Sequence, residues 1–229
     1  MNFLPCFVAL ACAASLQAGQ IAVPNSQSPG GHWSLVFEEP ETEQFVFRAR
    51  SSETRRSTEL LPGSLATDED KLMFDCMAHT VQNVRSKKLD AVSYHVSWNR
   101  DATLLAIEAG AHKFAHFLLF RREGDRFSRI EVPVDFSGKL KGFVRETSPK
   151  IHKMGVNRFR EKDPLFGEYP RVCLLEDACV AFSTYGALCG KVFQDLPEEV
   201  QERLTSGPEL YFLLRVRKAG PAEFVGFCQ

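Results

Sequence analysis

The chain has little tyrosine and tryptophan, few cysteines and almost no excess of charge. Its 229 residues include 19 phenylalanines but only 4 tyrosines and 2 tryptophans, which is typical of core filling rather than of a surface that stacks on sugars or bases. The net charge is -1 and the basic residues are scattered, so we expect no nucleic-acid partner. After residue 18 no uncharged apolar stretch is long enough to cross a membrane, so we expect no transmembrane segment.

The motifs of common catalytic and cofactor sites are also missing. The chain has no G-x-S-x-G elbow, no G-x-G-x-x-G turn and no P-loop. The carboxylate pairs Glu38-Glu39 and Glu198-Glu199 fall in a predicted turn and on a predicted helix surface, where solvation is the default. We therefore predict no catalytic residue and no cofactor, which favours a non-enzymatic role.

The N-terminal residues 1–18 carry no charge and are mostly small or apolar. This composition is typical of a secretory signal peptide that is cleaved near Ala18. Residues 19–30, rich in Ser, Pro, Gly and Gln, are expected to form an irregular leader. We therefore expect a secreted or periplasmic protein. The alternative is a lipid-anchored protein, since Ala-Leu-Ala precedes Cys12.

The cysteine content excludes a scaffold built on disulfide bonds. Two of the 7 cysteines lie within residues 1–18, and the odd number that remains requires at least one thiol outside any intrachain disulfide. Cys173, Cys179 and Cys189 are close in sequence and are the disulfide candidates. For each of them a small buried hydrophobic residue is an equally good interpretation.

Two β-type segments have the same layout. SPGGHWSLVF, starting at Ser28, is echoed by NRDATLLAIE, starting at Asn99, and each copy continues through an apolar run and basic residues to a proline. The spacing between Ser28 and Asn99 equals that between Pro62 and Pro133. A unit of this kind cannot bury its own apolar face and must stack on neighbours. The repeat therefore predicts an array of antiparallel β-meanders.

Short β-branched or aromatic runs between turn residues predict the individual strands. We expect a single β-rich domain over residues 31–229, with a third and looser copy near the C-terminus that opens with a strand at 178–184. The repeat units are expected at about 31–62, 91–133 and 172–228. The strands of the first two units are predicted at 33–38, 44–50, 56–61, 91–98, 103–109, 115–121 and 126–133.

Two helical insertions are also predicted. Residues 68–85 have acidic residues at the start and basic residues at the end, which suits the helix dipole. Apolar residues recur there at intervals of three or four, at Met73, Met77, Val81 and Val84. The second helix is expected at 195–207, with Asp195 as its N-cap and Gly207 at its end.

The segments SPGGHWSLVF and WNRDATLLAI resemble W-S-P-D-G-x-x-L-A-F, the strand-opening element of WD-repeat and TolB-like β-propeller blades. The first carries Gly30 in place of Asp, and the second keeps Trp98 and Asp101 but loses the proline. The resemblance implies a mainly β fold that is a partial or degenerate β-propeller. Because a closed propeller needs at least four blades, an open β-array or a sandwich are the alternatives. The resemblance also implies a binding or scaffolding surface, and it carries no active-site residues.

Glu108, His112 and His116 are the candidate metal ligands because they are spaced by four residues. On a helix this spacing would place them around a zinc ion. The surrounding sequence instead predicts strand, loop and strand, with Gly110 in the turn, and solvated loop histidines are the alternative. Two functions stay open at this point: a module that binds a protein or glycan partner, and an extracytoplasmic hydrolase that uses carboxylates or His112 and His116.

Overall fold

The computed structural model describes residues 19–38, 45–62, 66–86, 94–111, 114–135 and 211–228, with shorter pieces at 138–139, 142, 151–152, 172–175, 178–183, 198 and 202. Its elements are β1 (Gln20–Ala22), η1 (Pro29–Gly31), β2 (Trp33–Glu38), β3 (Val46–Ser51), β4 (Ser57–Glu59), α1 (Asp68–Arg85), β5 (Tyr94–Trp98), β6 (Leu104–Ala111), β7 (Phe114–Glu123), β8 (Arg126–Arg129), β9 (Ile151–His152), β10 (Val172–Leu175), β11 (Cys179–Ser183), β12 (Tyr211–Arg215) and β13 (Glu223–Cys228).

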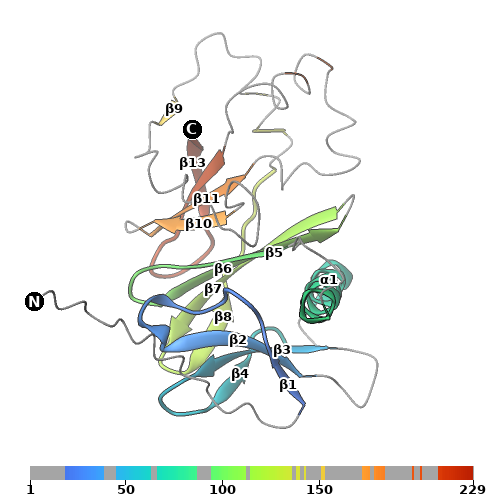
Figure 1. Ribbon diagram of the computed structural model, residues 1–229. Helices are drawn as coiled ribbons and strands as arrows, with labels where there is room; N and C mark the ends of the chain where they lie inside the picture. The colour runs from blue at the N-terminus through green and yellow to red at the C-terminus, as the bar shows by residue number, and fades with distance from the viewer. Residues whose placement is uncertain are drawn as a thin grey trace, which may run out of the picture.

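The strands form three sheets, and the protein is mainly β as the sequence predicted. Sheet A has the order β1-β2-β3-β4, sheet B has the order β5-β6-β7-β8, and sheet C has the order β10-β11-β12-β13-β9. All pairings are antiparallel except that of β13 with the short strand β9. The described strands do not close into a ring. Figure 1 shows the sheets one above another, with α1 beside sheets A and B.

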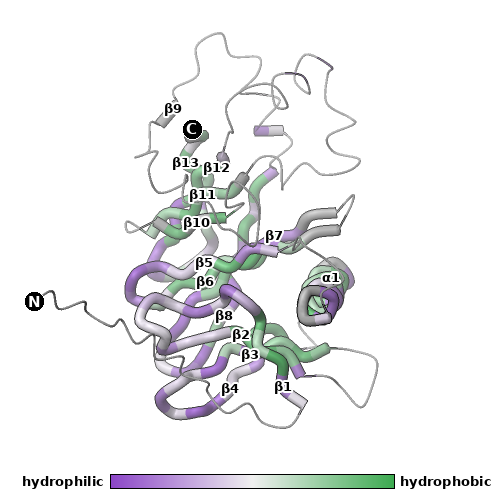
Figure 2. Tube along the Cα trace, viewed as in Figure 1, coloured by the Kyte–Doolittle hydropathy of each residue, from purple (hydrophilic) through white to green (hydrophobic). Residues whose placement is uncertain are grey.

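Sheet B is buried on both faces. Leu105 and Ile107 of β6 belong to a core shared with sheet A and α1. The residues between and beside them, Leu104 and Ala106, belong to a second core shared with sheet C. Successive side chains of a strand point to opposite faces, so β6 contributes to both cores. Its continuous apolar run is therefore explained by burial on two sides, and Figure 2 shows β6 as largely hydrophobic.

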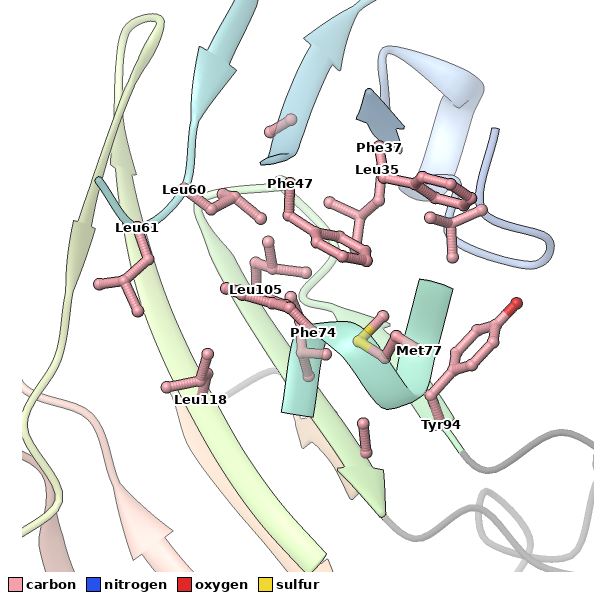
Figure 3. Close-up of a cluster of buried hydrophobic side chains, with 14 of the residues drawn as sticks. Leu35, Phe37, Phe47, Leu60, Leu61, Phe74, Met77, Tyr94, Leu105 and Leu118 are labelled. Atoms are coloured by element: carbon pink, nitrogen blue, oxygen red, sulfur yellow. The ribbon is translucent and has the colours of Figure 1, made fainter. Parts of the chain in front are cut away.

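The predicted helix at 68–85 is confirmed as α1. Met73 and Met77 are fully buried, as is Val81 one turn further on. The ring of Phe74 stacks on that of Phe47 from β3, with centroids 4.5 Å apart. Figure 3 shows Phe74 and Met77 pointing from the helix into the core between sheets A and B. Across the described residues we find no helix with the length and apolarity that a membrane span needs.

The prediction of two helical insertions is not confirmed. Among the elements that the structure describes, α1 is the single α-helix. The expected second helix at 195–207 lies outside the described residues, apart from isolated positions 198 and 202. The signal peptide expected at 1–18 also lies outside them.

The opening turns of the two repeats are equivalent in their hydrogen bonds. In the first copy the Ser28 backbone N–H donates to the Trp33 carbonyl, and the Ser28 hydroxyl accepts from the Trp33 N–H at 3.0 Å. In the second copy the Asn99 N–H donates to the Leu104 carbonyl, and the Asn99 amide oxygen accepts from the Leu104 N–H at 2.9 Å. Ser and Asn therefore play the same role with different side chains, because both offer an oxygen to a nearby backbone N–H.

Sheet C contains strands from the region where the third, looser copy of the repeat is expected. The strand expected at 178–184 is observed as β11, and it pairs with β12. The hairpin of β12 and β13 has Gly220 at φ +81° in its turn, as the β7–β8 hairpin has Gly124 at φ +60°. A positive φ favours glycine, which explains why both hairpins carry one there.

Candidate functional site

A hollow of about 730 Å³ lies at the end of sheets A and B where the two opening turns meet. Its walls come from η1, the loop after β3, residues 100–102 and the β7–β8 hairpin, and we call it the turn hollow. Small-molecule sites in proteins occupy roughly 300–1,000 Å³, so the turn hollow is large enough for a ligand of that size. Its ionisable side chains are His32, Glu53, Arg100, Asp101, Arg122 and Asp125.

Arg122 fixes the shape of the turn hollow. Its guanidinium lies over the ring of Trp33, 5.1 Å from the ring centroid. The same group donates hydrogen bonds to the carbonyls of Ala102 at 2.6 Å and Gly124 at 2.8 Å. A planar guanidinium can stack on an aromatic ring and donate at its edge simultaneously. Arg122 therefore joins the second repeat to the indole ring of the first.

A second hollow, of about 560 Å³, adjoins the first on sheet A, and Asp125 lines both. We call it the arginine hollow because four of its lining residues are arginines, from β3, the β3–β4 loop and β8. Its charged lining residues are Arg48, Arg55, Arg56 and Arg126, with Glu38 and Asp125. Positive groups therefore outnumber negative ones in this hollow.

A buried charge cluster joins α1 to sheet B. The carboxylate of Asp70 is fully buried, and its two oxygens lie 2.8 Å from His116 Nε2 and 2.7 Å from Arg129 Nη1. Thr67 and Asp70 also form a reciprocal cap: the Thr67 N–H donates to the carboxylate at 2.8 Å, and the Asp70 N–H donates to the Thr67 hydroxyl at 3.2 Å. This is a capping box with Asp in the place usually held by Glu.

These contacts decide the protonation of Asp70. Burial by itself raises the pKa of a carboxyl group. Hydrogen bonds from Thr67 and His116 and the charge of Arg129 outweigh burial here, and the pKa of Asp70 lies below its ordinary value of 3.8. The carboxylate is therefore ionised at neutral pH, and both of its oxygens are occupied. The arrangement holds the first turn of α1 on β7 and β8.

The three predicted metal ligands are not brought together as far as the structure describes them. Glu108 pairs in register with Phe117, and His116 pairs with Ala109. Paired residues share a face and successive residues alternate, so Glu108 and His116 lie on opposite faces of sheet B. Glu108 is fully buried beside the core shared with sheet C, whereas His116 faces α1. His112 lies outside the described residues.

The disulfide candidates are only partly described. Cys173 pairs in register with Ala181, and Cys179 pairs with Leu175, so the two cysteines are not directly opposite each other in the β10–β11 hairpin. Cys189 lies outside the described residues. Residues diagonal across a strand pair are about 7–8 Å apart, which exceeds the usual α-carbon separation of a disulfide bond. The register therefore does not favour a bond between Cys173 and Cys179.

The two hollows are not predicted from the sequence. The basic pairs Arg55-Arg56 and Arg121-Arg122 are typical of solvated strand edges, but Arg122 covers an aromatic ring and Arg55 and Arg56 line a hollow. Neither role has a signal in the sequence, because each depends on a partner strand or loop far along the chain. The Thr67-x-x-Asp70 cap does have a local signal, since its two residues are three apart at the start of a periodic apolar run.

Comparisons with known proteins give a weak structural likeness and no family. No protein-family model matches the chain, and no curated protein matches it. Among solved structures, TolB from Acinetobacter baumannii is similar with a TM-score of 0.32 and 9% sequence identity, over 91% of this chain and 33% of the TolB chain. The chain thus spans about a third of the length of that TolB structure.

Proposed function

We propose that this protein is an exported, non-enzymatic binding module that engages a protein or glycan partner with the loop ends of sheets A and B. The observation that supports the proposal most is the pair of adjoining hollows at that end of the sheets. Turns from both repeats contribute to them, and the stacked sheets behind supply a rigid support. Rigid scaffolds that present loops at one end are a common basis of binding sites.

The turn hollow is held in shape before any partner arrives. The Arg122 guanidinium already donates to the Ala102 carbonyl and covers the ring of Trp33, so this side chain is part of the wall. The Nδ1 of His32 and the Oε1 of Glu53 lie 2.7 Å apart at the rim. Arg100 and Asp101, at the tip of the second opening turn, are exposed and face the hollow. A preformed wall with exposed charged groups at its rim lowers the ordering cost of binding.

Site-specific photo-cross-linking tests this proposal even while the identity of the partner is unknown. A photoreactive residue replaces Arg100 in one variant and Lys218 in a matched control; both positions are exposed, but Lys218 does not line either hollow. Irradiation in the native exported fraction is expected to give a discrete adduct from position 100 and none from position 218. Equal labelling at both positions, or no adduct from either, would contradict the proposal.

A hydrolase is the second candidate, and the Asp70–His116 pair is the observation that favours it. A carboxylate that orients an imidazole is a recurring element of hydrolytic sites. In this protein the same carboxylate also binds Arg129 and caps α1, which suits a structural role. A panel of ester, peptide and glycoside substrates separates the two candidates. The binding proposal expects no turnover that His116→Ala abolishes, and the hydrolase requires such turnover.

A further inference from the structure

The arginine hollow concentrates positive charge that the protein does not neutralise internally. Glu38 is already engaged, because its Oε1 accepts a hydrogen bond from Gln20 at 2.7 Å and its Oε2 lies 3.0 Å from Arg48 Nε. Among the described residues, the side chains of Arg55, Arg56 and Arg126 form no ion pair with an acidic group. Like charges gathered in one concavity repel one another unless an anion is present.

The neighbouring acidic groups Glu123 and Asp125 do not cancel the excess of positive charge in the arginine hollow. Glu123 stands opposite Arg126 in the register of β7 and β8, but no ion pair joins the two described side chains. Asp125 lines the hollow from the hairpin tip. The lining therefore holds four guanidinium groups against two carboxylates, one of which is committed to Arg48. Once the Glu38–Arg48 pair is set aside, three arginines face one carboxylate, so the hollow carries a net positive charge.

The loop that carries Arg55 and Arg56 is fixed in a strained conformation. Arg55 has φ +58°, in the left-handed region that non-glycine residues avoid. The Ser51 N–H donates to the Arg56 carbonyl at 2.9 Å, which closes the loop between β3 and β4. The Thr58 hydroxyl donates to the Asp125 carbonyl at 2.6 Å, which ties β4 to the β7–β8 hairpin. Such a conformation persists because the surrounding structure maintains it, so the loop is preformed. Figure 2 shows the connection between β3 and β4 as a hydrophilic segment.

We propose that the arginine hollow binds a tetrahedral oxyanion, namely the phosphate or sulfate group of a larger ligand. The planar fork of the arginine guanidinium matches the oxygens of such a group, and arginine is the preferred residue for this recognition. The volume of about 560 Å³ exceeds that of a single ion and leaves room for the remainder of the ligand. This inference rests on the proposed binding function and specifies the chemistry that one part of the binding face recognises.

Isothermal titration calorimetry of the purified full chain tests the proposal with inorganic phosphate, pyrophosphate and sulfate as probes. Chloride keeps the ionic strength constant, so that general screening is the same in every titration. Tighter binding of phosphate and pyrophosphate than of sulfate indicates a phosphorylated ligand, and the reverse order indicates a sulfated one. No heat beyond that of the chloride blank overturns the proposal.

Variants locate the binding to this hollow. Arg126→Gln and Arg55→Gln are each expected to weaken binding roughly tenfold, the effect of losing one charged hydrogen-bond donor. Lys218→Gln removes a positive charge at an exposed position that lines neither hollow, so it is the matched control and is expected to leave the affinity unchanged. Asp125→Asn removes a repulsive charge and is expected to tighten binding several-fold. Equal affinity in all four variants would overturn the proposal.

A glycine substitution separates binding from folding. Arg55→Gly relieves the positive φ, so it is expected to raise the unfolding temperature while it weakens oxyanion binding. A variant that loses affinity because it is misfolded would show the opposite change in stability. The cross-linking experiment at Arg100 is independent of this result. An adduct there without oxyanion binding leaves the binding module standing and rejects only the oxyanion site.

Discussion

Arg122 lies over the indole of Trp33, with its guanidinium carbon 5.1 Å from the ring centroid, and so connects β7 of the second repeat to the first residue of β2 in the first. Trp33 is 5% exposed, and Phe127 packs on the same ring edge-to-face at a centroid distance of 5.2 Å. At the turn hollow, Arg122 therefore links sheets A and B as a cation placed between a ring and two backbone carbonyls, beside the packing of Phe127 on Trp33.

Arg122→Lys is expected to lower the free energy of unfolding by about 1–2 kcal/mol, because a lysine cannot reach both the Ala102 and Gly124 carbonyls while it stacks on Trp33. Urea unfolding followed by tryptophan emission measures this change. Arg121→Lys is the control, since Arg121 bonds the Arg217 carbonyl on the other side of the sheet. A loss from Arg121→Lys as large as that from Arg122→Lys would contradict the assigned role.

Asp70→Asn is expected to destabilise the protein by about 3 kcal/mol, because it removes the charge that His116 and Arg129 face in a buried site. Asp68→Asn, two residues earlier on the same helix, is the matched control. Asp68 is fully exposed and its ion pair with Lys71 spans 3.4 Å, so its replacement is expected to leave the stability nearly unchanged. Differential scanning calorimetry of the two variants makes the comparison.

The stability of the protein is expected to fall in acid because of Asp70. The pKa of this carboxyl is lower in the folded state than its ordinary value of 3.8, so its contribution is present above the unfolded pKa and is lost as the pH falls through the folded pKa. The wild-type protein should therefore lose stability below about pH 4. Asp75 acts in the opposite direction, since burial raises its pKa despite the charge of His79.

The control for this pH dependence is the Asp70→Asn variant. It lacks the titrating group, so its free energy of unfolding is expected to depend less steeply on pH below about 4 than that of the wild type. Urea titrations at a series of pH values measure both slopes. Parallel slopes for the two proteins would show that Asp70 does not carry the acid sensitivity.

Gly31→Ala is expected to cost about 1 kcal/mol, purely from backbone strain. Gly31 has φ +71°, and an added Cβ would meet no atom within 4 Å. Gly142 is the control: an added Cβ is also free of contacts there, but no positive φ is present, so Gly142→Ala should not destabilise the protein. Thermal unfolding of both variants distinguishes strain from packing. A neutral Gly31→Ala would contradict the assigned turn.

Local features of this fold were predictable because short-range interactions specify them. The helix at 68–85 was found from its periodicity, and its buried face is the one that Met73, Met77 and Val81 predicted. The strand of residues 33–38 was predicted with its observed bounds. The turn chemistry of Ser28 and Asn99 lies in their own side chains and the next few backbone amides. The repeat can therefore be recognised from the sequence without knowledge of how the strands pair into sheets.

The sequence by itself determined that the chain forms stacked antiparallel meanders, because strand periodicity and turn residues act within a few positions. Only the tertiary structure decided that Asp70 meets His116 and Arg129, and that Glu108 and His116 lie on opposite faces of sheet B. It also brought Arg48, Arg55 and Arg126 into one hollow. These contacts join residues from different strands, loops and the helix α1, and they depend on the register of the strands and on how the sheets and α1 pack together. Pairing across a sheet depends on both partners, so no single segment of the sequence carries that information.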